Sequence, residues 1–281
     1  GTSVSINSAG DRVAIGAIRN DGTSGDSGDD RGHVRVYAYS SGSWSQLGSD
    51  IDGEAAGDYF GTSVSMNSDG DRVAIGATYN DGTSGDSDDN RGHVRVYAYS
   101  SGSWTQLGSD IDGEAAEDYS GNVSMNSAGD RVAIGAPRND GTASSAGHVR
   151  VYEYSSGSWT QLGSDIDGAS GDDRFSNGVS LNSDGDRVAI GAKYGGNGGH
   201  AQVWAYSGSS WSQLGSTIDS EAAGDRFGWS VSIDSDGDRV AIGGFTNDGA
   251  GDAAGHARVY EYSNSSWTQL GSDMDGEAAG D

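Results

Sequence analysis

The feature that most constrains the fold of this chain is a repeat that occurs five times within its 281 residues. The segment Gly-Asp-Arg-Val-Ala-Ile-Gly places its isoleucine at positions 15, 75, 134, 190 and 242, so the spacing shortens from 60 to 52 residues. A Gly-His pair follows in every copy, and a tryptophan lies 11 residues after each histidine. Because a period of this length is typical of arrays of one small structural unit, we expect five such units to fill the chain.

Each unit is expected to fold as four short strands, and the first copy shows the pattern. We predict strands at 4–7, 12–17, 33–39 and 44–51, separated by turns and loops rich in Gly, Ser, Asn and Asp. The second strand is apolar on both faces, which is typical of a strand covered on both sides. No segment has the periodicity and capping residues of a helix.

Four antiparallel strands repeated every 52–60 residues predict an all-β fold, a five-bladed β-propeller of four-stranded antiparallel blades. A linear β array or solenoid is the alternative. We favour a closed ring, because the second strand carries small residues such as Ala14 and Gly16 on its less hydrophobic face. The chain is thus predicted to be a single β-propeller domain, 1–281, made of repeats at 1–60, 61–119, 120–175, 176–227 and 228–281.

Charge and composition exclude several classes of function. The formal net charge is −26, with 42 acidic residues against 16 basic ones, and Lys193 is the only lysine. A surface this acidic repels nucleic acid and anionic lipid, and no apolar stretch is long enough to cross a membrane. The absence of cysteine excludes disulfides, thiolate metal sites and cysteine nucleophiles. We therefore expect no nucleic-acid partner and no membrane insertion.

Several short motifs resemble the FG-GAP repeat. They are Phe60-Gly61 before a short strand, Ala-Ile-Gly-Ala-Pro at 133–137 and Gly-His-Val-Arg-Val-Tyr at 32–37. That family builds the β-propeller of integrin α-subunit heads and of many bacterial and algal surface proteins, and segment 104–116 is similar to a subfamily in secreted proteins of marine microbes. The resemblance covers all five units and implies an extracellular or cell-surface location.

One part of the FG-GAP pattern is missing. The calcium loop of that family lies between the first and second strands, and here the turn is shortened to Asn-Ser-Ala/Asp-Gly-Asp. This turn is too short to supply carboxylates at loop positions 1, 3, 5 and 9. Integrin-like ligand recognition is therefore not carried over from the resemblance.

The acidic connector between units is the candidate metal site. In three connectors the carboxylates fall at positions 1, 3, 5 and 9, and alternate carboxylates around a glycine bend can converge on one hard cation. The alternative is a solvated acidic turn whose carboxylates accept backbone N–H groups. We predict calcium as the cofactor, with the following ligands: Asp50, Asp52, Glu54 and Asp58; Asp110, Asp112, Glu114 and Asp118; and Asp273, Asp275, Glu277 and Asp281.

Two connectors depart from this spacing. The third has Ala169 in place of the glutamate, and the fourth has Thr217 in place of the first aspartate. Because each change removes a carboxylate, we expect unequal calcium occupancy among the connectors.

Other repeated residues are assigned structural roles. The tryptophan of each unit, beginning with Trp44, is expected to fill a gap between blades, and the Asp-Arg pairs, beginning with Asp11-Arg12, to brace blades through hydrogen bonds. The five histidines are expected to bond the nearby backbone rather than form a metal-binding ring. Trp204 and Trp229 lie at positions where the other repeats have no tryptophan. Because exposed aromatic rings can stack on sugars, these two are the candidate ligand-binding residues.

The sequence favours an extracellular structural or adhesive β-propeller module, calcium-stabilised and part of a longer repetitive surface protein or fibre. Its partners would be other copies or domains of that protein or fibre, or extracellular glycans or proteins. The alternative is a lectin-like carbohydrate-binding propeller with repeated sites at the blade junctions. Catalysis requires unlike groups brought together at one place. Because the charged groups here are repeated, we expect no enzyme and no catalytic residues.

Overall fold

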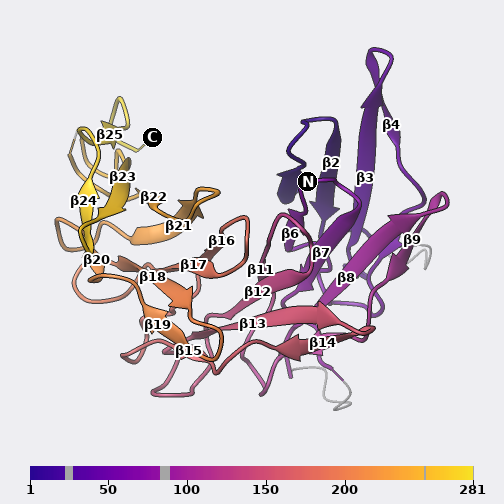
Figure 1. Ribbon diagram of the computed structural model, residues 1–281, viewed down its shortest axis with the longest axis horizontal. Helices are drawn as coiled ribbons and strands as arrows, with labels where there is room; N and C mark the ends of the chain where they lie inside the picture. The colour runs from indigo at the N-terminus through magenta and orange to yellow at the C-terminus, as the bar shows by residue number, and fades with distance from the viewer. Residues whose placement is uncertain (23–27, 83–88, 250, 281) are drawn as a thin grey trace. The chain divides into compact units, whose positions relative to one another are not determined.

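The computed structural model describes residues 1–22, 28–82, 89–249 and 251–280 (Figure 1). These residues form 25 β-strands without any helix, so nowhere among them is there a helix of the length and apolarity that crossing a bilayer requires. The strands assemble into five antiparallel sheets, one for each sequence repeat. The prediction of an all-β fold with four-stranded blades is confirmed.

Every sheet has four main strands in chain order and a two-residue fifth strand that also pairs with the third. The strands of the first sheet are β1 (Ser3–Ile6), β2 (Arg12–Ala17), β3 (His33–Ser40), β4 (Ser43–Gln46) and β5 (Ile51–Asp52). Those of the second are β6 (Ser63–Met66), β7 (Arg72–Ala77), β8 (His93–Ser100), β9 (Ser103–Gln106) and β10 (Ile111–Asp112).

The other three sheets repeat this order. The third contains β11 (Asn122–Met125), β12 (Arg131–Ala136), β13 (His148–Ser155), β14 (Ser158–Gln161) and β15 (Ile166–Asp167). The fourth contains β16 (Gly178–Leu181), β17 (Arg187–Ala192), β18 (His200–Tyr206), β19 (Trp211–Gln213) and β20 (Ile218–Asp219). The fifth contains β21 (Phe227–Ile233), β22 (Arg239–Gly244), β23 (His256–Ser263), β24 (Ser266–Gln269) and β25 (Met274–Asp275).

The prediction of one continuous strand at 44–51 is wrong, because the segment forms two strands, β4 and β5. Both pair with β3, with Tyr37 opposite Gln46 and Val34 opposite Ile51. Gly48 lies between them with a φ of +77°, a left-handed conformation that breaks the strand.

The chain divides into two compact units. Unit 1 comprises Gly1–Ile134 and Tyr152–Gln161, and unit 2 comprises Gly135–Val151 and Leu162–Asp281. In unit 1 a core of buried side chains joins the first two sheets, with Val34 of β3 and Ile75 of β7 among its members. In unit 2 a corresponding core joins the fourth and fifth sheets. The apolar groups are thus buried between sheets, as they are in packed blades.

The phenylalanine of the connector is the largest anchor of this packing. Phe60 and Phe227 are both 0% exposed. The backbone of Phe60 forms a parallel bridge with Gly32, whose φ is +77°. A Cβ at Gly32 would lie 2.1 Å from the carbonyl oxygen of Phe60. This close approach explains the glycine of the repeated Gly-His pair.

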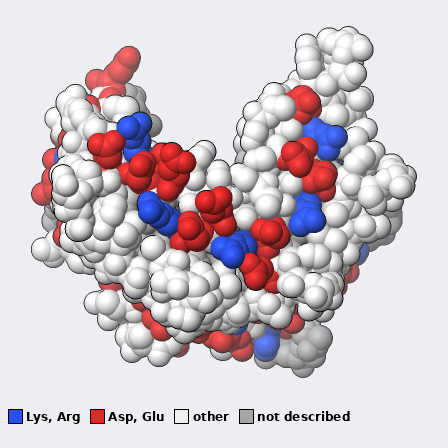
Figure 2. All heavy atoms as spheres, in the orientation of Figure 1, with Lys and Arg blue, Asp and Glu red and all other residues white. Residues whose placement is uncertain are grey.

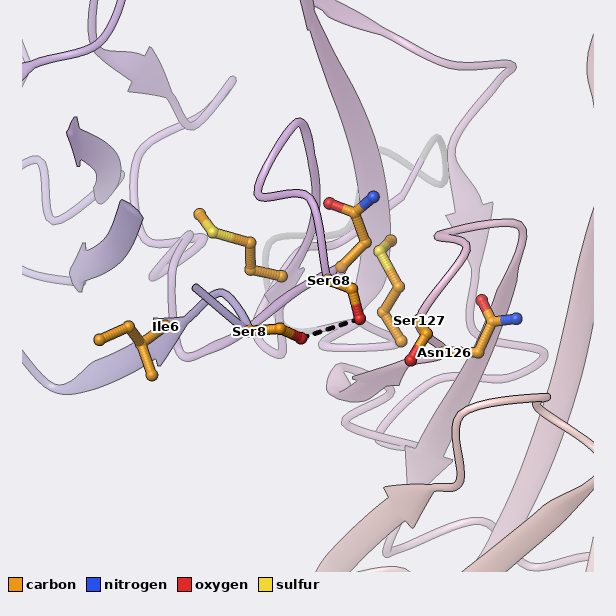
Figure 3. A pocket seen from close by; sticks show the side chains of 8 residues that line it. Ile6, Ser8, Ser68, Asn126 and Ser127 are labelled. Carbon is orange, nitrogen blue, oxygen red and sulfur yellow. Dashed lines mark hydrogen bonds between the residues drawn. The ribbon is translucent and has the colours of Figure 1, made fainter. Parts of the chain in front are cut away.

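The short turn between the first and second strands is closed by its own side chains. Asn7 Oδ1 accepts hydrogen bonds from the backbone N–H groups of Asp11 and Arg12, and Asn7 Nδ2 donates to Asp11 Oδ1 at 2.8 Å. In unit 1, Ser8 Oγ donates to Ser68 Oγ of the next turn at 3.0 Å (Figure 3). The turns of adjacent blades therefore lie side by side.

In the first, second and fourth sheets the arginine that begins the second strand braces the next blade, as predicted. Arg12 Nη1 donates to the carbonyl oxygen of Gly70 at 3.1 Å, and Arg187 Nη1 donates to that of Gly237 at 3.0 Å. A charged donor on a backbone carbonyl forms a strong hydrogen bond, so these contacts fix the blade spacing.

Candidate functional site: the acidic joints between blades

The first connector divides its carboxylates between two sheets. Asp50 stays with its own sheet, where Arg35 Nε and Nη2 donate to its two oxygens at 2.9 and 2.8 Å. Glu54 instead crosses to the second sheet and forms an ion pair with Arg95 of β8. Positions 1 and 5 of the predicted calcium loop therefore have different arginine partners.

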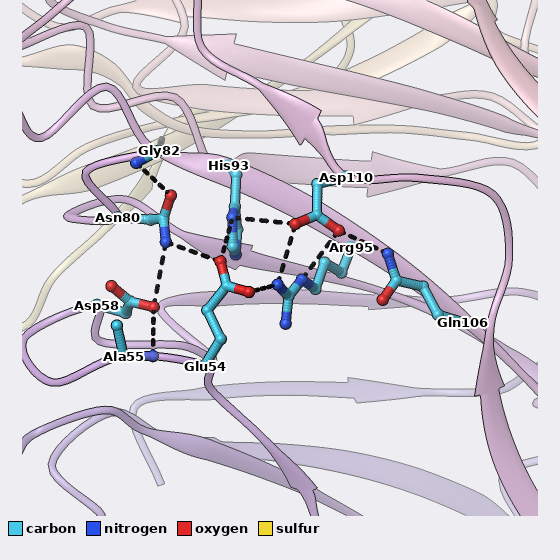
Figure 4. A network of polar contacts seen from close by, with 9 residues as sticks. All are labelled: Glu54, Ala55, Asp58, Asn80, Gly82, His93, Arg95, Gln106 and Asp110. Carbon is cyan, nitrogen blue, oxygen red and sulfur yellow. Dashed lines mark hydrogen bonds and ion pairs between the residues drawn. The ribbon is translucent and has the colours of Figure 1, made fainter. Parts of the chain in front are cut away.

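Arg95 is the centre of a joint cluster that consists of Glu54, His93, Arg95 and Asp110 (Figure 4). Its guanidinium donates to the two oxygens of Asp110 at 3.0 and 2.9 Å while it contacts Glu54. The His93 Nδ1 atom lies 3.7 Å from Glu54 Oε1. Burial opposes the ionised form of Asp110, but hydrogen bonds from Arg95 and Gln106 hold its pKa below the usual value. Acids from two successive connectors thus share one guanidinium.

The last acid of the first connector has a different role. Asp58 is only 2% exposed and accepts hydrogen bonds from the backbone N–H of Ala55 and from Asn80 Nδ2, both at 3.1 Å. Burial raises the pKa of Asp58, against the effect of these two hydrogen bonds. Asp58 therefore closes the connector turn and ties it to the second sheet.

The remaining predicted calcium ligands pair with an arginine, close a connector turn, or are exposed. Arg258 pairs with Glu221 and with Asp273, so the fifth sheet repeats the joint cluster. Asp118 is 2% exposed and accepts the N–H of Ala115 at 3.0 Å. The other side chains are exposed, except that of Asp281, which lies outside the described residues; they are Asp52, Asp112, Glu114, Asp275 and Glu277.

The two irregular connectors of the sequence are explained by one altered cluster in the fourth sheet. Gln202 of β18 replaces the arginine, and its Nε2 atom donates to Thr217 Oγ1 at 3.3 Å. Ala169 takes the place that Glu54 has before the second sheet. The arginine and both carboxylates are thus lost together, and a neutral hydrogen bond remains. This joint change indicates that positions 1 and 5 of the connectors act as counter-ions to the arginine.

A cation could also be held near the joint clusters. In the group His33, Asp50 and Asp52, one possible ligand atom of each residue lies within 4.8 Å of the others, and Glu54, His93 and Asp110 form a similar group. In the joint cluster, however, the Arg95 guanidinium already contacts both carboxylates. Calcium binding at the connectors stays a prediction.

Four of the repeated histidines, His33, His93, His148 and His256, are buried near the joints, and His200 is half-buried. Burial lowers the pKa of His33, His93 and His200, so each is a neutral imidazole at pH 7. The unfolded chain takes up these protons near the ordinary value of 6.5, whereas the folded chain takes them up only at lower pH. Stability is therefore lost as the pH falls below 6.5.

We expect the melting temperature to fall between pH 7 and pH 5.5, and the variant His200→Gln to show a smaller fall. His200 is suited to this test because its sheet has Gln202 in place of the arginine. Scanning calorimetry across this pH range provides the measurement. Parallel pH profiles of the two proteins would show that His200 does not contribute.

The repeated tryptophans join neighbouring sheets. In the second to fifth repeats the indole Nε1–H donates to the carbonyl oxygen of a leucine in the preceding repeat, which places these four tryptophans between blades as predicted, whereas Trp44 of the first repeat is 46% exposed. The pairs are Trp104–Leu47 and Trp159–Leu107 at 2.8 Å, and Trp211–Leu162 and Trp267–Leu214 at 2.7 Å.

The two tryptophans that occur once lie in different surroundings. Trp204 is half-buried in β18, and its Nε1–H donates to Gln202 Oε1 at 3.0 Å. Trp229 of β21 is 47% exposed and packs edge to face against Phe245, with 4.9 Å between ring centroids. Of the two predicted ligand-binding residues, Trp229 is therefore the more accessible.

The recurring connector, the buried phenylalanine and the Gly-His strand are the parts that a family comparison can recognise. The model of the FG-GAP repeat matches residues 51–97 and 211–260. These two regions of the chain are FG-GAP repeats. A comparison with curated protein sequences gives no match.

Solved structures share the fold of these FG-GAP repeats at low sequence identity. TolB from Acinetobacter baumannii has a TM-score of 0.53 and 13% identity, covering 98% of this chain and 56% of its own. The periplasmic gluconolactonase PpgL from Pseudomonas aeruginosa has a TM-score of 0.51 and 12% identity, covering 98% and 85%. Sqt1 from Saccharomyces cerevisiae has a TM-score of 0.57 and 15% identity, covering 96% and 60%. The fold class of the chain is therefore a β-propeller.

Proposed function

We propose that this FG-GAP chain is an extracellular structural or adhesive β-propeller module within a longer repetitive surface protein or fibre. The observation that carries the proposal is the use of the charged groups. The arginines of the third strands and the connector acids hold neighbouring sheets together, and where the fourth sheet lacks the arginine, both acids are replaced as well. Charged groups that recur along the chain and hold neighbouring sheets together suit a scaffold better than an enzyme.

The surface charge supports the same proposal. Figure 2 shows acidic and basic side chains next to one another in clusters, while the formal net charge of the chain is −26. High salt screens the repulsion between the unpaired acids, and cations reduce it further. A chain with this balance suits a saline medium outside the cell. Its partners would be other copies or domains of the same surface protein, or extracellular glycans or proteins.

Calcium is part of the proposal in a limited form. Because Arg95 already pairs with both Glu54 and Asp110, calcium would rely on carboxylates outside the joint cluster, such as the exposed Asp52. We expect dissociation constants on the order of 10⁻⁴–10⁻³ M, the range of weak extracellular calcium sites. Titration calorimetry at constant ionic strength measures them. Submicromolar affinity, or no saturable heat, would contradict this form of the proposal.

The lectin-like alternative with equivalent sites at each junction has less support. In such a lectin the repeated tryptophans would be the rings on which sugars stack. Four of their indole N–H groups, however, already donate to leucine carbonyl oxygens. These part-buried polar contacts belong to the packing of the blades.

The location of the chain tests the proposed function directly. Antibodies against the purified chain should label intact cells of the source organism, and mild protease treatment of those cells should remove the signal. An antibody against a cytoplasmic protein of the same cells is the control for intact envelopes. Labelling only after permeabilisation would overturn the extracellular assignment.

A further inference from the structure

One surface of unit 2 breaks the repetition and gathers positive charge around an exposed ring. Arg174 and Arg226 lie over the ring of Tyr194, with their guanidinium carbons 5.1 and 4.6 Å from its centroid. The ammonium of Lys193 lies 5.0 Å from the same centroid and 3.9 Å from that of Trp229. We call these five residues the cationic aromatic patch.

The cations of the patch have no carboxylate partner, unlike Arg95 and Arg258. Among the described residues, no acidic side chain forms an ion pair within 4.0 Å of Arg174, Lys193 or Arg226. A neutral group, the amide oxygen of Asn177, faces Lys193 Nζ at 3.2 Å in the amide orientation that satisfies both groups. The chain has a net charge of −26, so a group of three cations without a carboxylate partner is unusual on its surface.

Lys193 shows the electrostatic consequence. It is only 9% exposed, and burial together with the positive charges of Arg174 and Arg226 lowers its pKa to about 8. Burying a charge is costly unless a group of opposite sign accompanies it. An anion bound at the patch would supply that missing charge.

Unit 1 contains the same arrangement without the charges. There Tyr79 occupies the place of Tyr194, and Tyr59 and Tyr119 pack against it with ring centroids 5.0 and 5.3 Å away. Thr78 stands where unit 2 has Lys193. The fold thus accommodates uncharged residues at all three cationic positions, so the cations are not needed for packing.

We propose that the cationic aromatic patch binds an acidic saccharide, with the cations holding a sugar carboxylate or sulfate and Trp229 contacting the ring. Guanidinium groups bind such oxyanions through paired hydrogen bonds. Trp229 and Tyr194 are 47% and 41% exposed, so aromatic surface lies next to the charge. A short ligand is favoured because the overall negative charge repels long polyanions. This site goes beyond the proposed structural function, which does not depend on it.

Calorimetry of the purified chain tests the proposal with three probes: glucuronate, glucose as its neutral counterpart, and inorganic sulfate. We expect one saturable site for glucuronate, at least tenfold weaker binding of glucose, and competition by sulfate. Binding of neither sugar, or equal binding of both, would overturn the proposal. Binding of sulfate without glucuronate would overturn its saccharide part.

Unit 1 supplies the matched variants. Arg174→Tyr, Lys193→Thr and Arg226→Tyr together copy Tyr59, Thr78 and Tyr119, and should weaken glucuronate binding at least tenfold while the circular dichroism spectrum is unchanged. The reverse set, Tyr59→Arg, Thr78→Lys and Tyr119→Arg, should add anion binding in unit 1. Undiminished binding in the first variant would place the site elsewhere and overturn the assignment.

The pH dependence provides a separate readout. Lys193, faced by Arg174, Arg226, Tyr194 and Asn177, loses its charge as the pH rises past about 8. Glucuronate affinity should therefore decrease between pH 7 and pH 9, and Lys193→Arg should flatten that decrease. A pH-independent affinity in the unaltered chain would contradict the role of Lys193.

Discussion

Replacing Phe60 with alanine is expected to lower the free energy of unfolding by about 3–5 kcal/mol. The side chain is 0% exposed and lies in the core between the first two sheets, where its ring meets Tyr97 edge to face at 6.5 Å. Removing the ring leaves a cavity in this core, and the surrounding structure relaxes only partly around such a cavity.

Urea unfolding monitored by circular dichroism measures this loss. The matched control is Val4→Ala, because Val4 is 70% exposed, and its substitution should change the free energy by about 0.5 kcal/mol or less. If the two variants unfold at the same urea concentration, Phe60 does not anchor the joint in the way described.

The second large effect is expected from Arg95→Gln, which should cost about 1–3 kcal/mol. The change removes the guanidinium that both carboxylates contact and leaves Glu54 and Asp110 facing one another. Removing one partner of a buried pair can cost about 3–5 kcal/mol. The carboxylates here are 44% and 29% exposed, so water reduces the penalty.

The control for Arg95→Gln is Arg239→Gln. Arg239 pairs with Glu261 at 2.9 Å, but the two side chains are 57% and 33% exposed. An ion pair of this kind contributes about 0–1 kcal/mol. Urea midpoints at low ionic strength compare the two variants. Equal losses would indicate that the joint cluster is no more than surface charge.

The repeats and strands could be predicted from the sequence because they depend on local patterns. The Val-Ala-Ile-Gly run identifies a strand covered on both faces, and the structure places it as the second strand of every sheet. The arginine at the start of that strand could be assigned to blade bracing because it recurs in the sequence, and the structure shows this role for Arg12, Arg72 and Arg187. The break at Gly48 was missed, since its left-handed conformation depends on a single residue within an otherwise regular strand pattern.

The partners of the connector acids could not be predicted from their spacing alone. Asp50 and Glu54 are close in sequence, but Asp50 returns to β3 whereas Glu54 reaches β8 of the next sheet. The useful signal was the shared change in the fourth sheet, where Ala169, Gln202 and Thr217 replace three charged residues. The shared change can be recognised only once the structure shows that these three positions lie in one cluster.

Only part of the cationic aromatic patch could be predicted from the sequence. Trp229 and the single lysine stand out as residues that are not repeated. Arg174 and Arg226, however, come from two different connectors and meet only over the ring of Tyr194. Long-range contacts of this kind depend on the packing of blades, which the local pattern does not specify.

The free energy of unfolding of the triple variant Glu54→Ala, Arg95→Gln and Asp110→Thr tests most directly whether the connector acids are counter-ions of the arginine. These substitutions copy the neutral cluster of the fourth sheet into the second. If they are counter-ions, the triple variant should be more stable than Arg95→Gln alone by about 1 kcal/mol or more. If the acids have another stabilising role, the triple variant will be less stable than Arg95→Gln, and the counter-ion account will be wrong.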